Sequence, residues 1–118
     1  MSEQKQSPLQ PLKLAFVLLP KYSMIAFASL IEPIRLANRE SGEVFFEWSC
    51  YSLDGAPVEA SNHVITQVDG GVRDLTDATL TLVCSGLDVE QIEAGPELGK
   101  RLRYLVAHGR MIGAACTG

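Results

Sequence analysis

The chain has 118 residues, with 10 Lys and Arg against 14 Asp and Glu, a net charge of −4 and 47% hydrophobic residues. This composition fits one globular domain with a buried core and excludes a disordered protein. The acidic balance argues against direct nucleic-acid binding, and no apolar stretch approaches the roughly 20 residues of a membrane span. Three widely spaced cysteines, Cys50, Cys84 and Cys116, indicate neither a disulfide framework nor a metal site. We therefore expect no metal, no cofactor and no membrane association, and a cytoplasmic protein without an export signal.

Predicted strands and helices alternate after a polar lead-in, residues 1–11, which we expect to be disordered. The apolar run at 12–19 is typical of a strand buried on both faces. A helix is expected over 23–39, with Ser23 as its N-cap and Gly42 as its left-handed C-terminal residue. Because Pro33 lies inside it, we expect a kink, or a break near residues 31–32. A strand is expected at 45–53, a hairpin of 58–60 and 64–67, and a turn at 69–71. These are followed by a strand at 80–84, a helix from 95 to about 108 and a strand at 111–115. The core stripe of this last helix should comprise Leu98, Leu102, Leu105 and Val106. This order predicts an α/β doubly wound, mostly parallel sheet between two helical layers.

Two features indicate apolar surface that needs a cover. The first half of the helix at 23–39 is apolar nearly all round, so more of the chain or a second subunit should cover it. The last strand, 111–115, has no helix after it, although a doubly wound sheet normally places one there. We therefore interpret residues 12–118 as a partial domain of a longer protein, truncated after this strand, and expect the isolated chain to be marginally stable.

The segment from Gly113 to Gly118 predicts a nucleophile elbow, a sharp strand-to-helix turn with small residues two positions on either side of Cys116. A helix N-terminus would favour the thiolate there, whereas the alternative is a buried, inert cysteine. Ser85 and Gly86 follow another buried strand, and their backbone N–H groups could form an anion site facing Cys116. The alternative is an ordinary strand-to-helix turn.

A catalytic cysteine needs a neighbouring acid or base to adjust the reactivity of its thiol, and the sequence offers none nearby. The loop and helix start at 21–28 contain no Asp or Glu, and Thr117, not histidine, follows Cys116. This loop carries Tyr22 and Phe27 instead, whose aromatic faces could hold a cationic ligand. Both rings could equally belong to the core.

Four motifs, taken together and in this order, resemble a known family. They are FVLLPKYSMIAFASLIEPIRLANR from residue 16, YSLDGAPVEAS from residue 51, VCSGLDV from residue 83 and GAACTG from residue 113. The chain from residue 12 onward resembles the N-terminal domain of AraC-family regulators of the GlxA type. That domain belongs to the ThiJ/PfpI, class I glutamine amidotransferase-like superfamily, and the resemblance implies a flavodoxin-like fold.

The resemblance further implies a sensor for a small-molecule effector, for which betaines or carnitine are examples in the family. It implies a homodimer that contacts DNA only through a C-terminal helix-turn-helix domain, which this chain lacks. Catalytic superfamily members use the elbow cysteine, here Cys116, with a glutamate at the start of the first helix, where this chain has Phe27 and apolar neighbours. We therefore expect a non-catalytic domain that binds its ligand with Tyr22, Phe27, Ser85, Gly86, Cys116 and Thr117. The alternative is a cysteine hydrolase or glyoxalase-like enzyme that uses Cys116.

Overall fold

The computed structural model describes residues 10–86 and 95–115, and its centre is a parallel β-sheet. Within these residues the sheet has five strands in the order β5-β2-β1-β6-β7, and every neighbouring pair is parallel. The strands are β1 (Leu12–Leu18), β2 (Phe46–Ser52), β5 (Gly70–Gly71), β6 (Leu80–Cys84) and β7 (Met111–Ala115). The expected α/β class with a doubly wound sheet is therefore confirmed.

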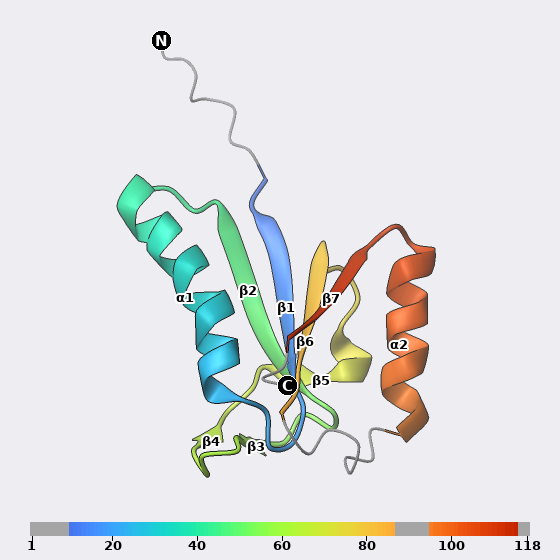
Figure 1. Cartoon of the computed structure of the whole chain (residues 1–118). Coiled ribbons are helices and arrows are strands. Elements are labelled where there is room, and N and C mark those ends of the chain that lie inside the picture. The colour runs from blue at the N-terminus through green and yellow to red at the C-terminus, as the bar shows by residue number, and fades with distance from the viewer. Residues whose placement is uncertain (1–9, 87–94, 116–118) are drawn as a thin grey trace.

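The connections between strands cover the two faces of the sheet. Helix α1 (Met24–Ser41) and helix α2 (Gly95–Ala107) lie on opposite sides of it, which gives the three predicted layers (Figure 1). The antiparallel hairpin of β3 (Val58–Glu59) and β4 (Ile65–Thr66) lies near the start of α1. A 3₁₀ turn, η2 (Val72–Asp74), packs beside α2. None of the helices that the structure describes is long and apolar enough to cross a membrane.

Alternation along β1 divides the core between the two faces of the sheet, because successive side chains of a strand point to opposite sides. Ala15, Val17 and Leu19 pack with Leu98 and Leu105 of α2. The α1 side of the sheet has its own cluster, which comprises Leu14, Phe16, Leu18, Tyr22, Val58, Ala60 and Cys84, with side chains of α1 and β2 against it. Strand β1 is thus buried on both faces over most of its length, as its continuous apolar run predicts.

The ends of helix α1 follow from its sequence. Ser23 is the N-cap, and its side-chain oxygen accepts a hydrogen bond from the Ala26 amide at 3.2 Å. Gly42 ends the helix with a φ of 75°, which glycine adopts without a steric penalty, and its amide donates to the Asn38 carbonyl. Of the two alternatives expected here, the break near residues 31–32 is wrong, since α1 is helical through these residues and through Pro33. Leu30, Ile31 and Ile34 pack against the sheet on both sides of Pro33 and hold the two halves together.

Two further sequence expectations are wrong. The segment Asp69–Gly71 was expected to be a turn only, but Gly70–Gly71 forms β5 at the edge of the sheet, paired with the end of β2. Two glycines carry no side-chain pattern by which a strand could be recognised. Val106 was expected in the core stripe of the last helix, but it is 58% exposed. The other three residues expected in that stripe, Leu98, Leu102 and Leu105, do pack against the core.

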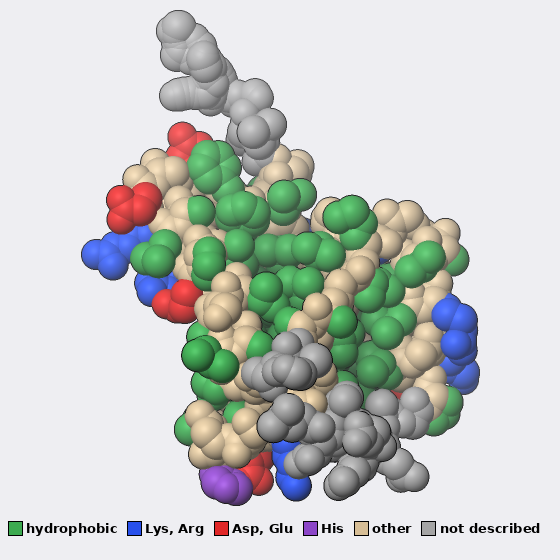
Figure 2. All heavy atoms as spheres, viewed as in Figure 1, with side chains coloured by type: hydrophobic (Ala, Val, Ile, Leu, Met, Phe, Trp, Pro, Cys, Tyr) green, Lys and Arg blue, Asp and Glu red, His purple; other side chains and the backbone are tan. Residues whose placement is uncertain are grey.

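An apolar groove lies open on the α1 face of the sheet. Its volume is about 340 Å³, and it is lined by Leu12, Leu14, Phe16, Leu30, Ile34, Phe46, Thr79, Leu80, Leu82 and Met111. Figure 2 shows hydrophobic side chains gathered over the part of the sheet between the two helices. No residue of α1 is fully buried, and Ile25 in its first turn is 73% exposed. The exposed apolar side chains of the groove and of α1 thus agree with the expectation that apolar surface is left uncovered on this chain.

Candidate functional site

The loop after β1 positions Tyr22 and the start of α1. Lys21 adopts a left-handed conformation with a φ of 64°, which is uncommon for a residue other than glycine. Its amide donates to the Glu59 carbonyl at 2.8 Å, and the Tyr22 carbonyl accepts from the Ser61 amide at 2.9 Å. The β3–β4 hairpin therefore holds this turn in place through backbone hydrogen bonds.

The structure brings the two predicted aromatic residues together. The rings of Tyr22 and Phe27 meet edge to face at 5.8 Å, and Phe27 meets Phe16 in the same way at 5.4 Å. Tyr22 is fully buried, and its hydroxyl hydrogen-bonds the Thr66 hydroxyl at 2.5 Å. Burial raises the pKa of Tyr22 above its ordinary value, so this hydroxyl stays protonated at neutral pH. In the described structure Tyr22 thus serves as a core residue beneath the carboxyl edge of the sheet.

The loop after β6 is hydrogen-bonded to the end of β7 and to the start of α1. The Ser85 amide donates to the Ala115 carbonyl at the end of β7, and the Ser85 carbonyl accepts from the Ser23 amide. The Ser85 N–H group is therefore already paired, which contradicts its expected role as a donor in an anion site. Gly86 lies against the Lys21 carbonyl so closely that a Cβ atom there would come within 2.3 Å of that oxygen. Cys116 and Thr117 lie outside the described residues, so their predicted roles remain predictions.

A cleft at the carboxyl ends of β1 and β2 was not predicted from the sequence. Its volume of about 480 Å³ lies within the range of about 300–1,000 Å³ that is typical of small-molecule sites. Leu18, Pro20, Ser52, Leu53, Asp54, Ala56, Pro57, Val58, Glu59 and Glu97 line it. Apolar residues thus line the cleft together with three acidic residues, which come from the turn after β2, the hairpin and the first turn of α2. A smaller hollow of about 320 Å³ shares Leu53, Asp54 and Glu97 with this cleft.

The carboxylates of the cleft differ in their partners. Asp54 accepts a hydrogen bond from the Ala56 amide at 3.0 Å, which fixes the turn after β2. Glu59 lies 2.8 Å from the His63 ring nitrogen. Because carboxylates beside apolar residues favour a positive charge with an apolar body, the cleft suits a small organic cation. The signal that could have revealed it is the position of Asp54, which directly follows a predicted strand at the sheet edge where α/β proteins bind ligands.

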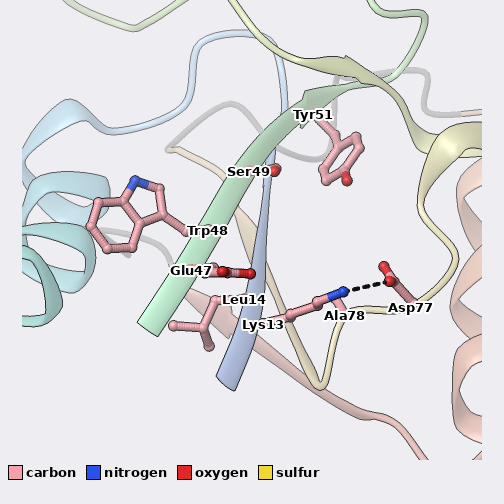
Figure 3. A pocket seen from close by; sticks show the side chains of 8 residues that line it. All are labelled: Lys13, Leu14, Glu47, Trp48, Ser49, Tyr51, Asp77 and Ala78. Carbon is pink, nitrogen blue, oxygen red and sulfur yellow. Dashed lines mark hydrogen bonds and ion pairs between the residues drawn. The ribbon is translucent and has the colours of Figure 1, made fainter. Parts of the chain in front are cut away.

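A further hollow, of about 200 Å³, lies on the α2 side of the sheet beside β1 and β2 (Figure 3). There the Lys13 ammonium pairs with Asp77 at 3.1 Å, and Tyr51 points to the same side of β2 as Glu47. Both ionic side chains are largely exposed, so this pair adds little to stability. This hollow is separate from the carboxyl edge and takes no part in the candidate site. Among the described residues, no group of three or more His, Cys, Asp or Glu side chains could hold a metal ion.

The two cysteines of the described sheet have unreactive thiols. Burial raises the pKa of Cys50 to about 11, with a smaller contribution from the charge of Asp69. Burial likewise raises the pKa of Cys84 to about 12. Since the thiolate is the nucleophile, neither residue is suited to covalent catalysis at neutral pH.

We expect Cys50 and Cys84 to be alkylated by iodoacetamide at pH 8 about 100-fold more slowly in the native chain than after unfolding. The raised pKa values also stabilise the fold below the ordinary thiol pKa, and this stability is lost as the pH rises through about 11 and 12. Mass spectrometry of the alkylated peptides measures the rates. Equal rates in native and unfolded protein would contradict the burial of these thiols.

Comparison with known proteins shows which proteins this chain resembles. No family model matches the chain. The HTH-type transcriptional regulator GbdR of Pseudomonas aeruginosa is 33% identical over 108 residues, which make up 92% of this chain and 29% of the regulator. CdhR, another such regulator of that organism, is 36% identical over 103 residues, or 87% of this chain and 30% of the regulator. The chain thus spans about three tenths of the length of these curated relatives.

Two solved structures share the fold. The crystal structure of an AraC-family transcriptional regulator from Pseudomonas putida matches with a TM-score of 0.76 and 27% identity, over 88% of this chain and 55% of that one. A DJ-1 superfamily protein from Agrobacterium tumefaciens matches with a TM-score of 0.65 and 18% identity, over 87% of this chain and 52% of that one. The chain is thus similar in sequence to AraC-type transcriptional regulators and shares its fold with a DJ-1 superfamily protein. The cleft, Tyr22, Ser85 and Gly86 lie at the carboxyl edge of the sheet.

Proposed function

We propose that this chain is the effector-sensing domain of a transcriptional regulator and that its effector is a small organic cation, such as a quaternary amine. The observation that carries this proposal is the cleft of about 480 Å³, which Asp54, Glu59 and Glu97 line together with apolar residues. Methyl groups of a quaternary ammonium would contact the exposed side chains of Pro20 and Pro57 and the half-buried side chain of Leu53, while the carboxylates supply the opposite charge.

The regulatory output lies in other parts of the protein. Effector binding would change the arrangement of domains or subunits in a cytoplasmic homodimer and so change the affinity for DNA. DNA would be contacted by a helix-turn-helix domain outside this chain, since the chain itself carries a net charge of −4. The two HTH-type regulators that are similar to this chain support a role of this kind.

The absence of an acid near the start of α1 supports sensing without catalysis. The first turn of α1 contains no acidic residue, whereas catalytic members of the superfamily carry a glutamate there. The thiols of Cys50 and Cys84 are held protonated by burial, so neither supplies a nucleophile. Cys116 and Thr117 would then contact the effector without reacting with it, whereas Ser85 and Gly86 do not line the cleft and hold the neighbouring turn instead.

A calorimetric titration with matched ligands tests this proposal. We expect glycine betaine to bind, and 3,3-dimethylbutanoate, in which carbon replaces the charged nitrogen, to bind at least tenfold more weakly. The two molecules have the same shape and the same carboxylate, so the difference isolates the ammonium charge. Equal affinity for both would contradict cation recognition, and no binding of glycine betaine, carnitine or tetramethylammonium would overturn the proposed effector class.

A further inference from the structure

The turn Lys21–Ser23 lies between the cleft and the start of helix α1. On one side, Pro20 and Glu59 line the cleft, and the Glu59 carbonyl accepts a hydrogen bond from the Lys21 amide at 2.8 Å. On the other side, Ser23 is the N-cap of α1 and bonds the Ala26 amide through its side chain. A displacement of the cleft wall at Glu59 would therefore act directly on the residues that begin the helix.

The loop after β6 fixes this turn from the opposite direction. The Ser85 carbonyl accepts from the Ser23 amide at 3.1 Å, and Gly86 packs against the Lys21 carbonyl. A Cβ atom on Gly86 would come within 2.3 Å of that oxygen, a distance that side chains do not reach, so the backbone would have to move. Lys21 itself has a φ of 64°, a sparsely populated conformation that persists only where the surroundings determine it. The turn is thus held on two sides in a conformation that it would not keep alone.

Helix α1 is suited to respond to such a movement. None of its residues is fully buried, and Ile25, in the same first turn as Ala26, is 73% exposed. The helix is held to the sheet by partly buried side chains such as Phe27 and Leu30. In its first turn only Met24 and Phe27 pack against the sheet, so the rest of this turn can change its position or its fraying without breaking a buried contact.

We propose that the Lys21–Ser23 turn transmits occupancy of the cleft to the first turn of α1, and that Gly86 is the positioning residue for this turn. The inference rests on the proposed function, because it assigns a regulatory output to the same site. A cation in the cleft would hold the Glu59 segment, and through the Lys21 amide it would hold Ser23 and the N-cap. By reciprocity, a firmly capped helix would increase the affinity of the cleft for the cation.

The test compares Gly86→Ala with Gly99→Ala by amide hydrogen exchange measured by NMR. Gly99 lies in α2, where an added Cβ would meet only an arginine side-chain atom at 3.5 Å, so it is a matched glycine-to-alanine control. Without ligand, we expect the Ala26 and Phe27 amides of Gly86→Ala to exchange at least tenfold faster than in wild type. The amides of α2 should be unchanged, and Gly99→Ala should match wild type throughout α1. Unchanged exchange at Ala26 and Phe27 in Gly86→Ala would overturn the inference.

Addition of glycine betaine separates this inference from the proposed function. In wild type we expect saturating glycine betaine to slow exchange at Ala26 and Phe27 at least threefold. In Gly86→Ala it should bind within about threefold of its wild-type affinity and leave these amides unaffected. Binding to wild type without any slowing would overturn the transmission alone. Failure of glycine betaine to bind wild type would count against the proposed function, while the ligand-free comparison would still decide the role of Gly86.

A measurement on the wild-type protein decides the case in which Gly86→Ala does not fold. If the turn, the loop after β6 and the N-cap form one unit, the amides of Ser23, Ser85 and Phe27 should open together. We expect their protection factors to agree within about threefold. A spread of more than a hundredfold would contradict the linkage, because the three amides would then open independently.

Discussion

Replacement of Phe16 by alanine is expected to lower the free energy of unfolding by about 3–5 kcal/mol. Phe16 is fully buried in the middle of β1, and its ring meets that of Phe27 edge to face at 5.4 Å. The substitution removes this contact and leaves a cavity beneath α1. Since small domains are stable by only about 5–15 kcal/mol, the variant should lose a large share of its stability.

Urea denaturation followed by circular dichroism measures this effect. Ile25→Ala is the matched control, because Ile25 lies in the first turn of α1 but is 73% exposed. We expect the control to change the free energy of unfolding by less than about 0.5 kcal/mol. A loss below 1 kcal/mol for Phe16→Ala would mean that the α1 face of the sheet is not packed as described.

The double substitution Asp54→Asn with Glu97→Gln is expected to weaken glycine betaine binding about thirtyfold. Each carboxylate contributes about 1 kcal/mol to the attraction of a cation in a solvent-accessible cleft, so the pair contributes about 2 kcal/mol. Asparagine keeps an oxygen that can accept the Ala56 amide hydrogen bond, so the turn after β2 should stay intact.

The control for this charge effect is Asp77→Asn. Asp77 pairs with Lys13 in the hollow on the α2 side of the sheet and lines no part of the cleft. Calorimetry at about 0.15 M salt should show wild-type affinity for this variant, because the Debye length is then about 8 Å and exposed charges are screened over the distance to the cleft. If Asp77→Asn weakens binding as much as the double variant does, the effect comes from net charge and not from the cleft.

The elements that a local pattern defines could be predicted from the sequence. The apolar run of β1, the Ser23 cap and the Gly42 terminus each depend on a few neighbouring residues, and the structure confirms all three. Strand β5 could not be predicted, because Gly70 and Gly71 carry no side chains and pair only through the backbone.

The candidate site depends on contacts between distant residues, which local patterns do not reveal. The aromatic character of Tyr22 could be read from the sequence, but its burial depends on Thr66 in a hairpin that lies 44 residues further along the chain. The cleft brings together Asp54, Glu59 and Glu97 from three separate elements. The close approach of Gly86 to Lys21 likewise exists only in the folded sheet, since β1 and β6 are neighbours in space but not in sequence.

The most direct test of cation sensing at the carboxyl edge is an NMR titration of the ¹⁵N-labelled protein with glycine betaine. We predict saturable chemical-shift changes confined to the cleft and the turn beside it, with the largest at the Leu53, Asp54, Glu59 and Lys21 amides. The signals of the Lys13, Glu47 and Asp77 amides, whose residues line the hollow on the α2 side of the sheet, should not shift. Shifts centred on that hollow, or no shifts at millimolar concentrations of glycine betaine, would contradict cation sensing at the carboxyl edge.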